Sequence, residues 1–439
     1  MGGPDMARRF QDAATASLKG RVGKVAWWSL PSGPQSMDRA MAMLPRLFHS
    51  RLDHMGIDFA HLFPTRGLTS VYIRDDEVRQ ASCRALNLMY RDMFRGTQDR
   101  LRPVAIVPTF TPAEAIAELD FAVRELDFKA VLIGTEIRRP DPDVVRDHPE
   151  LAPYSDKCTS IVMDAPHDYD PLWQRFCDLG VTPMAHTAGM GTRAHGYRSS
   201  SSNYVFNHIG GFASGAEFFC RGLFFGGVTR RFPQLTFGLM EGGVAWAQTL
   251  INDIVEHWEK RNIDALLKNL SPAGLDVDLL GRMFDQWGDA RLTGEGIRAS
   301  PHHFLARPEA PALLDEFAAC GMQELGDLQR LFIDRFYFGC EADDRMIAVA
   351  FNRRLNPLGL PLHPVLGSDI GHWDVMDASS ILSECYSLVQ GRLLTQDDFR
   401  QLTFVNPARM HLSMNPRYFE GTVVADATQA LAAPAEATP

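Results

Sequence analysis

Short apolar runs that alternate with longer amphipathic stretches restrict the fold of this chain more than any other feature of its sequence. Seven runs are candidate strands, near residues 57, 104, 129, 181, 235, 336 and 365. Strands of a parallel sheet that is buried on both faces have this appearance. The stretches between them give the order β-α-β-α, which predicts a parallel sheet covered by helices.

The stretch at 112–126 shows how the helices are recognised. Pro112 suits the first helical turn, and Thr111 before it is a good N-cap. The apolar residues recur with the spacing of one helical face, at Ala115, Ile116, Leu119 and Val123. Similar patterns predict helices at 171–179 and 244–260.

The number of strand candidates favours an α/β fold of one kind, a TIM-like (β/α)8 barrel whose first strand is absent or atypical. Seven candidates are one fewer than such a barrel needs. Residues 24–30 (KVAWWSL) could form a substitute strand. A doubly wound sheet is the competing architecture, but the glycines at 189, 191 and 196 do not form the loop G-x-G-x-x-G.

Three segments do not follow the repeat. Residues 1–45 form an atypical N-terminal segment before the barrel at 46–423. Residues 261–330 interrupt the barrel as a helical insertion, which we expect to cover one of its ends. Residues 424–439 are rich in alanine and proline, so we expect a disordered tail.

Composition excludes several classes of partner. The chain of 439 residues has 44 Lys and Arg against 54 Asp and Glu, a net charge of −10 at pH 7. This balance argues against binding to nucleic acid or to an anionic membrane and leaves a small molecule as the expected partner. No apolar run approaches the roughly 20 residues of a membrane span, and no secretory signal is visible. The seven scattered cysteines are typical of a reduced, cytoplasmic protein.

Chemistry in a barrel of this kind lies at the C-terminal ends of the strands. His186, Glu241 and Asp369 follow three candidate strands, so we expect them at the same end. Imidazole and carboxylate are suitable ligands for a divalent cation such as Zn²⁺ or Mn²⁺. Glu241 and Asp369 are also candidate proton carriers. Each of the three residues alone has an alternative explanation as a hydrogen-bonded structural residue.

Other residues are candidates for binding substrate. The stretch G-S-D-I-G-H-W-D at 367–374 is polar and follows a strand, and its His372 and Trp373 could line a pocket. The same stretch could simply cap the next helix through Asp374 or Asp377. Arg66 at another strand end, and Arg193 and His208 in the long loop at 187–208, could bind an anionic group. His61 lies within a candidate strand, where a hydrogen-bonded, buried histidine is expected.

Four phrases of the sequence resemble the amidohydrolase-related family, which includes enzymes similar to aminocarboxymuconate-semialdehyde decarboxylase. They are RLDHMGIDFAHLFPT (51–65), NHIGGF (207–212), GGVTRRFPQLTFGLMEGGVAW (226–246) and LGSDIGHWD (366–374). The resemblance covers residues 40–260 and 335–415. It implies a metal-dependent barrel in which His186 matches a metal ligand and Asp369 matches a ligand and acid/base. Glu241 falls where many members carry a histidine.

One departure from the family concerns the first strand. Members carry H-x-H or E-x-H there, which supplies two metal ligands, and this sequence has no such element. The chain could be shortened or have a wrongly assigned start, bind metal weakly, or be inactive.

The expected function is hydrolysis by a metal-dependent enzyme of the amidohydrolase-related type, acting on a small carboxylated or aromatic compound. One alternative is non-oxidative decarboxylation on the same fold. Another is a catalytically impaired binding or partner subunit. Resemblance to the family also makes a homodimer plausible.

Overall fold

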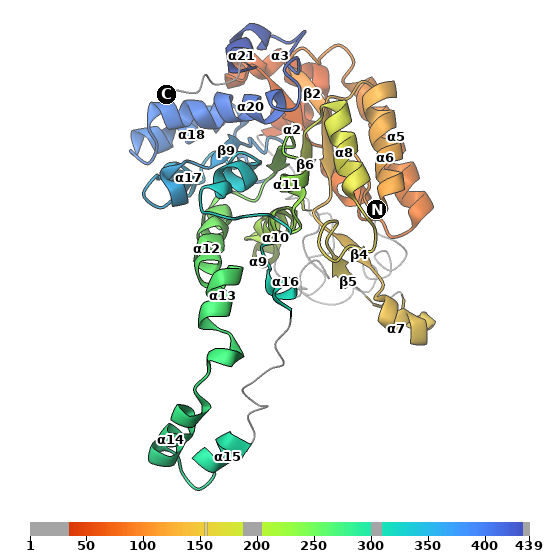
Figure 1. Ribbon diagram of the computed structural model, residues 1–439. Helices are drawn as coiled ribbons and strands as arrows, with labels where there is room; N and C mark the ends of the chain where they lie inside the picture. Colours follow the sequence, from red (N-terminus) through yellow and green to blue (C-terminus); the bar gives the residue numbers. More distant parts are fainter. Residues whose placement is uncertain (1–34, 153, 156, 188–203, 300–309, 433–439) are drawn as a thin grey trace, which may run out of the picture.

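The computed structural model describes residues 35–152, 154–155, 157–187, 204–299 and 310–432. Its main sheet has seven strands, and every neighbouring pair is parallel. In sheet order they are β1 (Ala60–Leu62), β2 (Leu101–Ile106), β3 (Ala130–Ile133), β6 (Pro183–Ala185), β7 (Phe237–Leu239), β8 (Phe336–Cys340) and β9 (His363–Leu366). All seven predicted strands are therefore confirmed, in a curled sheet of the TIM-barrel type (Figure 1).

The two faces of the sheet are buried in different clusters. On β2, Val104 and Ile106 face the inside of the curl, with Leu132 and Met184 from the next strands. The alternate residue Ala105 belongs to the outer cluster, which the helices cover. Burial on both sides explains why these strands are apolar runs without alternation.

Helices connect the strands and pack on the outer face. The main ones are α5 (Asp76–Met93), α6 (Pro112–Asp120), α8 (Asp170–Leu179), α10 (Gly211–Phe225), α12 (Ala245–Arg261), α17 (Ile347–Phe351) and α18 (Ile381–Gln390). The helices predicted from residues 112, 171 and 244 are confirmed. Thr111 and Glu114 form a capping box at the start of α6, as the sequence predicts for Thr111.

The N-terminal part of the described chain joins the two edges of the sheet. Helices α2 (Ser36–Met43) and α3 (Pro45–Met55) pack against Leu62 of β1 and against Ala378, which follows β9. Well-packed structure thus begins before residue 46. Within the described ranges, β1 and β9 form no ladder with each other. The possible strand at 24–30 lies outside the described residues.

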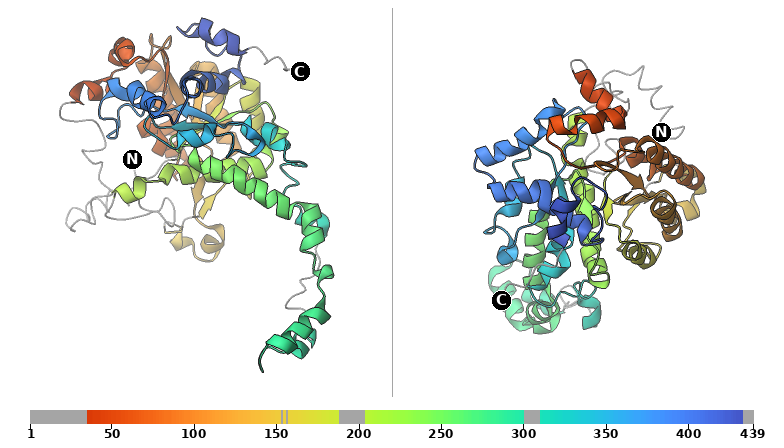
Figure 2. Two further views of the ribbon diagram at one scale, coloured as in Figure 1. Left: turned by 90° about the vertical axis from the view of Figure 1, so that its left-hand side faces the viewer. Right: turned by 90° about the horizontal axis from the view of Figure 1, so that it is seen from above.

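The insertion and the C-terminal segment differ from their predictions. Helices α13 (Ile263–Asn269), α14 (Val277–Trp287) and α15 (Gly294–Ala299) extend away from the barrel as an arm and do not cover either end of it (Figures 1 and 2). Of residues 424–439, expected to be a disordered tail, 425–432 form helix α21 (Ala425–Ala432), where Thr428 is buried, and 433–439 lie outside the described residues. None of the helices in the described part is long and apolar enough to span a membrane.

Candidate active site

His186 directly follows β6 and is almost completely buried. Its Nδ1 lies 2.8 Å from the carbonyl oxygen of Thr187, and its Nε2 lies 2.5 Å from Oε2 of Glu241. Because a carbonyl oxygen can only accept, Nδ1 carries a hydrogen and the orientation of the ring is fixed. His186 and Glu241, predicted from two separate strand ends, therefore meet in space.

The two predicted carboxylates have unusual backbones. The φ angle is 61° at Glu241 and 48° at Asp369, in the left-handed region that residues other than glycine rarely adopt. Such strain is typical of functional sites, where surrounding structure holds a side chain in place. Glu241 follows β7 and Asp369 follows β9, so both lie at the C-terminal edge of the sheet.

Asp369 makes a second carboxylate–histidine pair. Its Oδ1 is hydrogen-bonded to Nδ1 of His372, one turn along the loop. Nε2 of His372 lies 3.0 Å from Oγ1 of Thr65, at the start of α4 (Thr65–Ser70). The candidate helix cap is also present, because Asp377 accepts from the N–H of Ser379. The helix cap suggested at Asp377 is therefore confirmed, whereas a role of His372 and Trp373 in lining a pocket stays a prediction.

Negative charge accumulates at this edge. Burial raises the pKa of Glu341, which follows β8, to about 7, and the charges of Asp374 and Glu241 act in the same direction. Burial would by itself lower the pKa of His372, but the hydrogen bond and charge of Asp369 raise it to about 9. Burial also opposes ionisation of Glu241, yet its hydrogen bond with His186 outweighs this effect and lowers its pKa. Because of this negative charge, the C-terminal edge of the sheet favours the binding of protons or cations.

A row of rings borders the two pairs. Phe212 of α10 packs edge-on against His186, with centroids 5.3 Å apart. His208 of α9 (Tyr204–His208) follows at 5.5 Å from Phe212, and Trp373 at 5.6 Å from His208. We call Phe212, His208 and Trp373 the aromatic row. It brings together two of the predicted binding residues from segments 165 positions apart in the chain.

The structure leaves other predictions open. Arg193 lies outside the described residues, as does the side chain of Arg66, although its backbone belongs to α4. A surface hollow of about 220 Å³ lies at the opposite end of the strands, and none of the predicted site residues lines it.

Several polar residues behind His186 were not predicted. The hydroxyl of Tyr72 accepts from the N–H of Thr135 at 3.0 Å and donates to the carbonyl of His186 at 3.2 Å. Oγ1 of Thr135 lies 3.1 Å from that of Thr187, and Glu136 beside it is 2% exposed. The polar ends of the strands near 133 and 186 gave a signal for Thr135 and Glu136, whereas nothing in the sequence around Tyr72 did.

Comparison with known proteins identifies the family. The family model described as amidohydrolase matches residues 51–294, more than half of the chain. The chain belongs to the amidohydrolase family. This membership places it among enzymes and confirms the resemblance drawn from the sequence. No functionally curated protein gives a significant match to it.

Solved structures resemble this amidohydrolase in fold. An amidohydrolase from Mycobacterium avium subsp. paratuberculosis K-10 is 17% identical, with a TM-score of 0.52 over 87% of this chain and 77% of that one. An amidohydrolase II is 11% identical, with a TM-score of 0.50 over 92% and 96%. A dihydroxybenzoic acid decarboxylase from Polaromonas sp. JS666, with bound manganese, is 14% identical, with a TM-score of 0.45 over 82% and 84%. At these identities the likeness shows the fold alone.

Members of the family bind a divalent metal ion, so the donors of this amidohydrolase must be tested against one. His186 donates its Nδ1 hydrogen to a carbonyl, as metal-bound histidines do, which directs Nε2 at the carboxylate of Glu241. A cation held there would also offset the crowded negative charge. The donor atoms of His186 and Glu241 are therefore suitable for a divalent metal ion. Among the described residues, however, no three His, Cys, Asp or Glu side chains are already placed around one point as ligands.

Proposed function

We propose that this amidohydrolase is a metal-dependent hydrolase that acts on a small aromatic or carboxylated compound. The observation that carries the proposal is the pair of His–carboxylate hydrogen bonds, His186–Glu241 and His372–Asp369, at the C-terminal edge of the sheet beside the aromatic row. Hydrolysis needs one group that removes a proton from water and one that gives a proton to the leaving group, and the carboxylate and imidazole of one such pair can divide these tasks.

The residues have the following proposed roles. His186, Glu241 and Asp369 would hold the metal ion, Zn²⁺ or Mn²⁺, which would polarise a substrate oxygen and lower the pKa of a water. Asp369 accepts the proton of the water whose oxygen attacks the substrate carbonyl carbon. His372 orients Asp369 and can return this proton to the leaving group. Glu241 assists as a base or remains a ligand.

Substrate binding is assigned to the aromatic row and to the basic residues around it. An aromatic substrate could pack edge-to-face against Phe212 and Trp373, in the geometry that both rings already adopt with His208. A carboxylate of the substrate would be bound by Arg66 and Arg193, the candidates from the sequence.

Decarboxylation is the second candidate, because the aromatic row favours an aryl substrate and because this reaction needs only one proton donor. The Asp369–His372 pair would then protonate the ring carbon that loses CO₂. The products separate the two reactions: hydrolysis yields a new acid with an amine or alcohol, and decarboxylation releases CO₂. A panel of aromatic esters, amides and carboxylates, tested for both kinds of product, decides between them.

The first test of the proposal is metal binding. We expect purified protein to bind close to one Mn²⁺ or Zn²⁺ per chain and to unfold at a higher temperature when the metal is added. His186→Gln and Asp369→Asn should lose this shift, whereas the exposed Asp253→Asn should keep it. Once a substrate is found, Asp369→Asn should lower kcat by about 100-fold or more. Absence of metal binding, together with unchanged activity of Asp369→Asn, would contradict the proposal.

Two coarser proposals accompany the function. We propose a cytoplasmic location, which is supported by seven cysteines that are all free, five of them buried. We also propose that no nucleic acid or membrane takes part, on the basis of the net charge of −10.

A further inference from the structure

The arm carries an apolar surface that nothing in the described structure covers. On α14, Leu279, Met283 and Trp287 follow one another at intervals of four residues, so they form one stripe along the helix. These residues are 46%, 40% and 77% exposed. Leu275 and Leu292, which stand just before and just after α14 in the chain, are also exposed, at 41% and 57%. We call these five residues the arm stripe.

The other side of α14 is the one that packs within the chain. Gly281 and Gly294 lie so close that a Cβ on Gly294 would be 2.1 Å from the carbonyl oxygen of Gly281. Asp285 accepts from the N–H of Gly294 at 2.9 Å and from Arg298 at 3.0 Å. At 100° per residue, Gly281 and Asp285 lie opposite Met283. The polar and glycine face of α14 therefore holds α15, and its most apolar face is turned outward.

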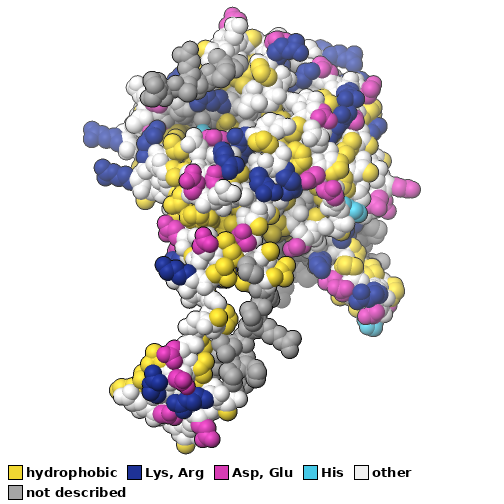
Figure 3. All heavy atoms as spheres, viewed as in Figure 1, with side chains coloured by type: hydrophobic (Ala, Val, Ile, Leu, Met, Phe, Trp, Pro, Cys, Tyr) yellow, Lys and Arg dark blue, Asp and Glu magenta, His cyan; other side chains and the backbone are white. Residues whose placement is uncertain are grey.

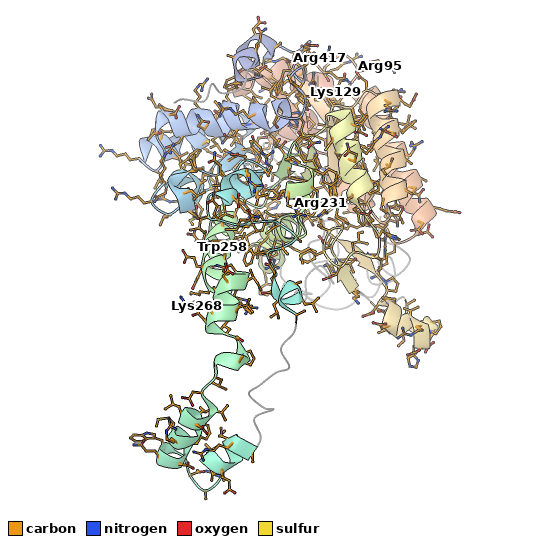
Figure 4. The ribbon with its side chains drawn as sticks, in the orientation of Figure 1. Arg95, Lys129, Arg231, Trp258, Lys268 and Arg417 are labelled. Carbon is orange, nitrogen blue, oxygen red and sulfur yellow. The ribbon has the colours of Figure 1, made fainter. Side chains whose placement is uncertain are left out.

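This arrangement is not that of a self-sufficient unit. The hairpin of α14 and α15 buries only Gly281, Gly294 and Ile297 below a tenth of their surface. A unit of this size cannot bury a core of its own. The barrel does not cover the stripe either, because the arm continues past α13 and stands clear of the barrel in Figure 1 and in the left view of Figure 2. In Figure 4, Trp258 of α12 and Lys268 of α13 mark the base of the arm.

Figure 3 shows hydrophobic side chains among charged ones of both signs at the end of the arm. Residues 276–298 carry five acidic residues and three arginines, so charges of opposite sign can pair when this face meets a copy of itself. The five side chains of the arm stripe expose roughly 500 Å² together, so two copies in contact would bury roughly 1,000 Å² of apolar surface alone. This area reaches the size of a specific interface.

We propose that the arm stripe is a dimerisation surface, and that its occupant is the arm stripe of a second copy of this chain, related by a two-fold axis. A two-fold contact buries the same face on both copies at once, which explains why a single amphipathic helix is turned outward. The proposal is independent of the reaction that the barrel catalyses.

Sedimentation velocity over a range of protein concentrations tests the proposal. The natural chain should be a dimer, and Met283→Glu and Trp287→Asp should each weaken the dimer by about 30-fold or more, because a central Trp or an inserted charge dominates such contacts. Met43→Glu is the matched control: Met43 is 64% exposed on α2, so it receives the same charge away from the arm, and its dimer should be unchanged. Equal thermal unfolding of all variants shows that the barrel still folds.

Photo-crosslinking identifies the occupant directly. A benzoylphenylalanine at position 287, in a mixture of isotopically light and heavy chains, should form light–heavy crosslinks to residues 275–292. A monomer at every concentration, or a dimer that keeps its affinity in both stripe variants, would overturn the proposal. Crosslinks only within one chain would overturn it as well, since the stripe would then be covered by another segment of its own chain.

Discussion

At the scale of single residues, Glu241 and Asp369 are two positions where the candidate site reduces the stability of the folded chain. Each holds a left-handed backbone conformation, which costs on the order of 1–3 kcal/mol, and each places a carboxylate beside other carboxylates. Neither arrangement stabilises the folded chain by itself. Both become understandable if the edge of the sheet is arranged for a bound ion and for proton transfer, as proposed above.

A substitution of Glu341 tests this crowding of negative charge and leaves the predicted metal ligands unchanged. Its pKa is raised from 4.5 to about 7, by burial first and then by Asp374 and Glu241. A raised carboxyl pKa means that the folded state binds the proton more tightly than the unfolded state, so stability is lost as the pH rises through 7. In the presence of a chelator, Glu341→Gln should therefore unfold a few degrees above the natural chain at pH 8.5 and show little difference at pH 5. Differential scanning fluorimetry measures both.

The control is two residues away. Asp343 is exposed on the same loop, so Asp343→Asn should change the unfolding temperature much less than Glu341→Gln does at either pH. If Glu341→Gln made no difference at pH 8.5, crowding of negative charge would not be a property of this edge.

For single residues, the sequence predicted which residues lie at the candidate site but not which side chains they contact. Residues after apolar runs could be predicted at one edge, because parallel strands end together, and this placed His186, Glu241 and Asp369. The partners of these residues depend on packing between distant segments. Thr65 meets His372 across 307 positions, and Tyr72 meets His186 across 114, so no local pattern could reveal either contact.

Among the elements, α5 and α6 are joined by a buried ionic contact. Arg79 of α5 is completely buried, and its Nη2 lies 2.7 Å from Oε2 of Glu114 on α6. It also donates to the carbonyl of Ile73, and its guanidinium stacks 3.7 Å above the ring of Phe110. Glu114 in turn accepts from the N–H of Phe110, before the helix begins. The pair thus fixes the loop that leads from β2 into α6.

Removing one member of this pair should cost more than removing both. Arg79→Met leaves the Glu114 carboxylate buried without its cation, which should lower the free energy of unfolding by about 3–5 kcal/mol. Adding Glu114→Met should recover a large part of this loss. Urea denaturation of the single and double variants measures both steps. A double variant less stable than either single one would show that the pair itself stabilises the fold.

The helices and strands were the part of the fold that the sequence predicted best. Each strand follows from a short apolar run and the helices near 112, 171 and 244 from local periodicity, and the packing of the sheet reinforces both. The sequence predicted that the arm is helical, but not that it extends away from the barrel. A helix with an apolar stripe has the same sequence pattern whether the stripe packs on its own barrel or on another chain. The helix α21 was missed because its alanines and polar residues give few apolar positions, and only its contact with α20 (Asn406–Leu412) buries it.

For the whole molecule, β1 is joined to the C-terminal part of the described chain by contacts with α20 and with the segment that follows it. His61 of β1 is hydrogen-bonded through Nε2 to the hydroxyl of Tyr418, at 2.6 Å. His411 of α20 stacks on Tyr418, with ring centroids 4.2 Å apart, and lies 4.5 Å from the ring of His61. Both His411 ring nitrogens lack hydrogen-bond partners among the described residues. These neutral histidines, together with Arg102 against the ring of Tyr418, hold β1 and β2 to α20 and the segment that follows it.

This contact should make the protein sensitive to acid. Burial, and then the charge of Arg102, lower the pKa of His61 from 6.5 to about 3, and burial, followed by the charges of His61 and Arg102, lowers the pKa of His411 well below its usual value. The unfolded chain therefore binds protons below pH 6.5 that the folded chain does not, so stability falls as the pH falls, by up to about 1.4 kcal/mol per pH unit for each histidine. His363, with its pKa lowered to about 4, adds to this loss, while Glu341 opposes it.

A variant isolates the contribution of His411. His411→Phe keeps a flat ring on Tyr418 and removes two buried, unpaired nitrogens, so it should unfold at a higher temperature than the natural chain at pH 7. It should also lose less stability between pH 6.5 and pH 4.5, because one of the groups that must take up a proton on unfolding is gone. His257→Phe, on the exposed part of α12, should leave the acid profile as it is. Unfolding in urea at several pH values measures the difference. Parallel profiles for the natural chain and His411→Phe would mean that acid weakens the protein elsewhere than at this junction.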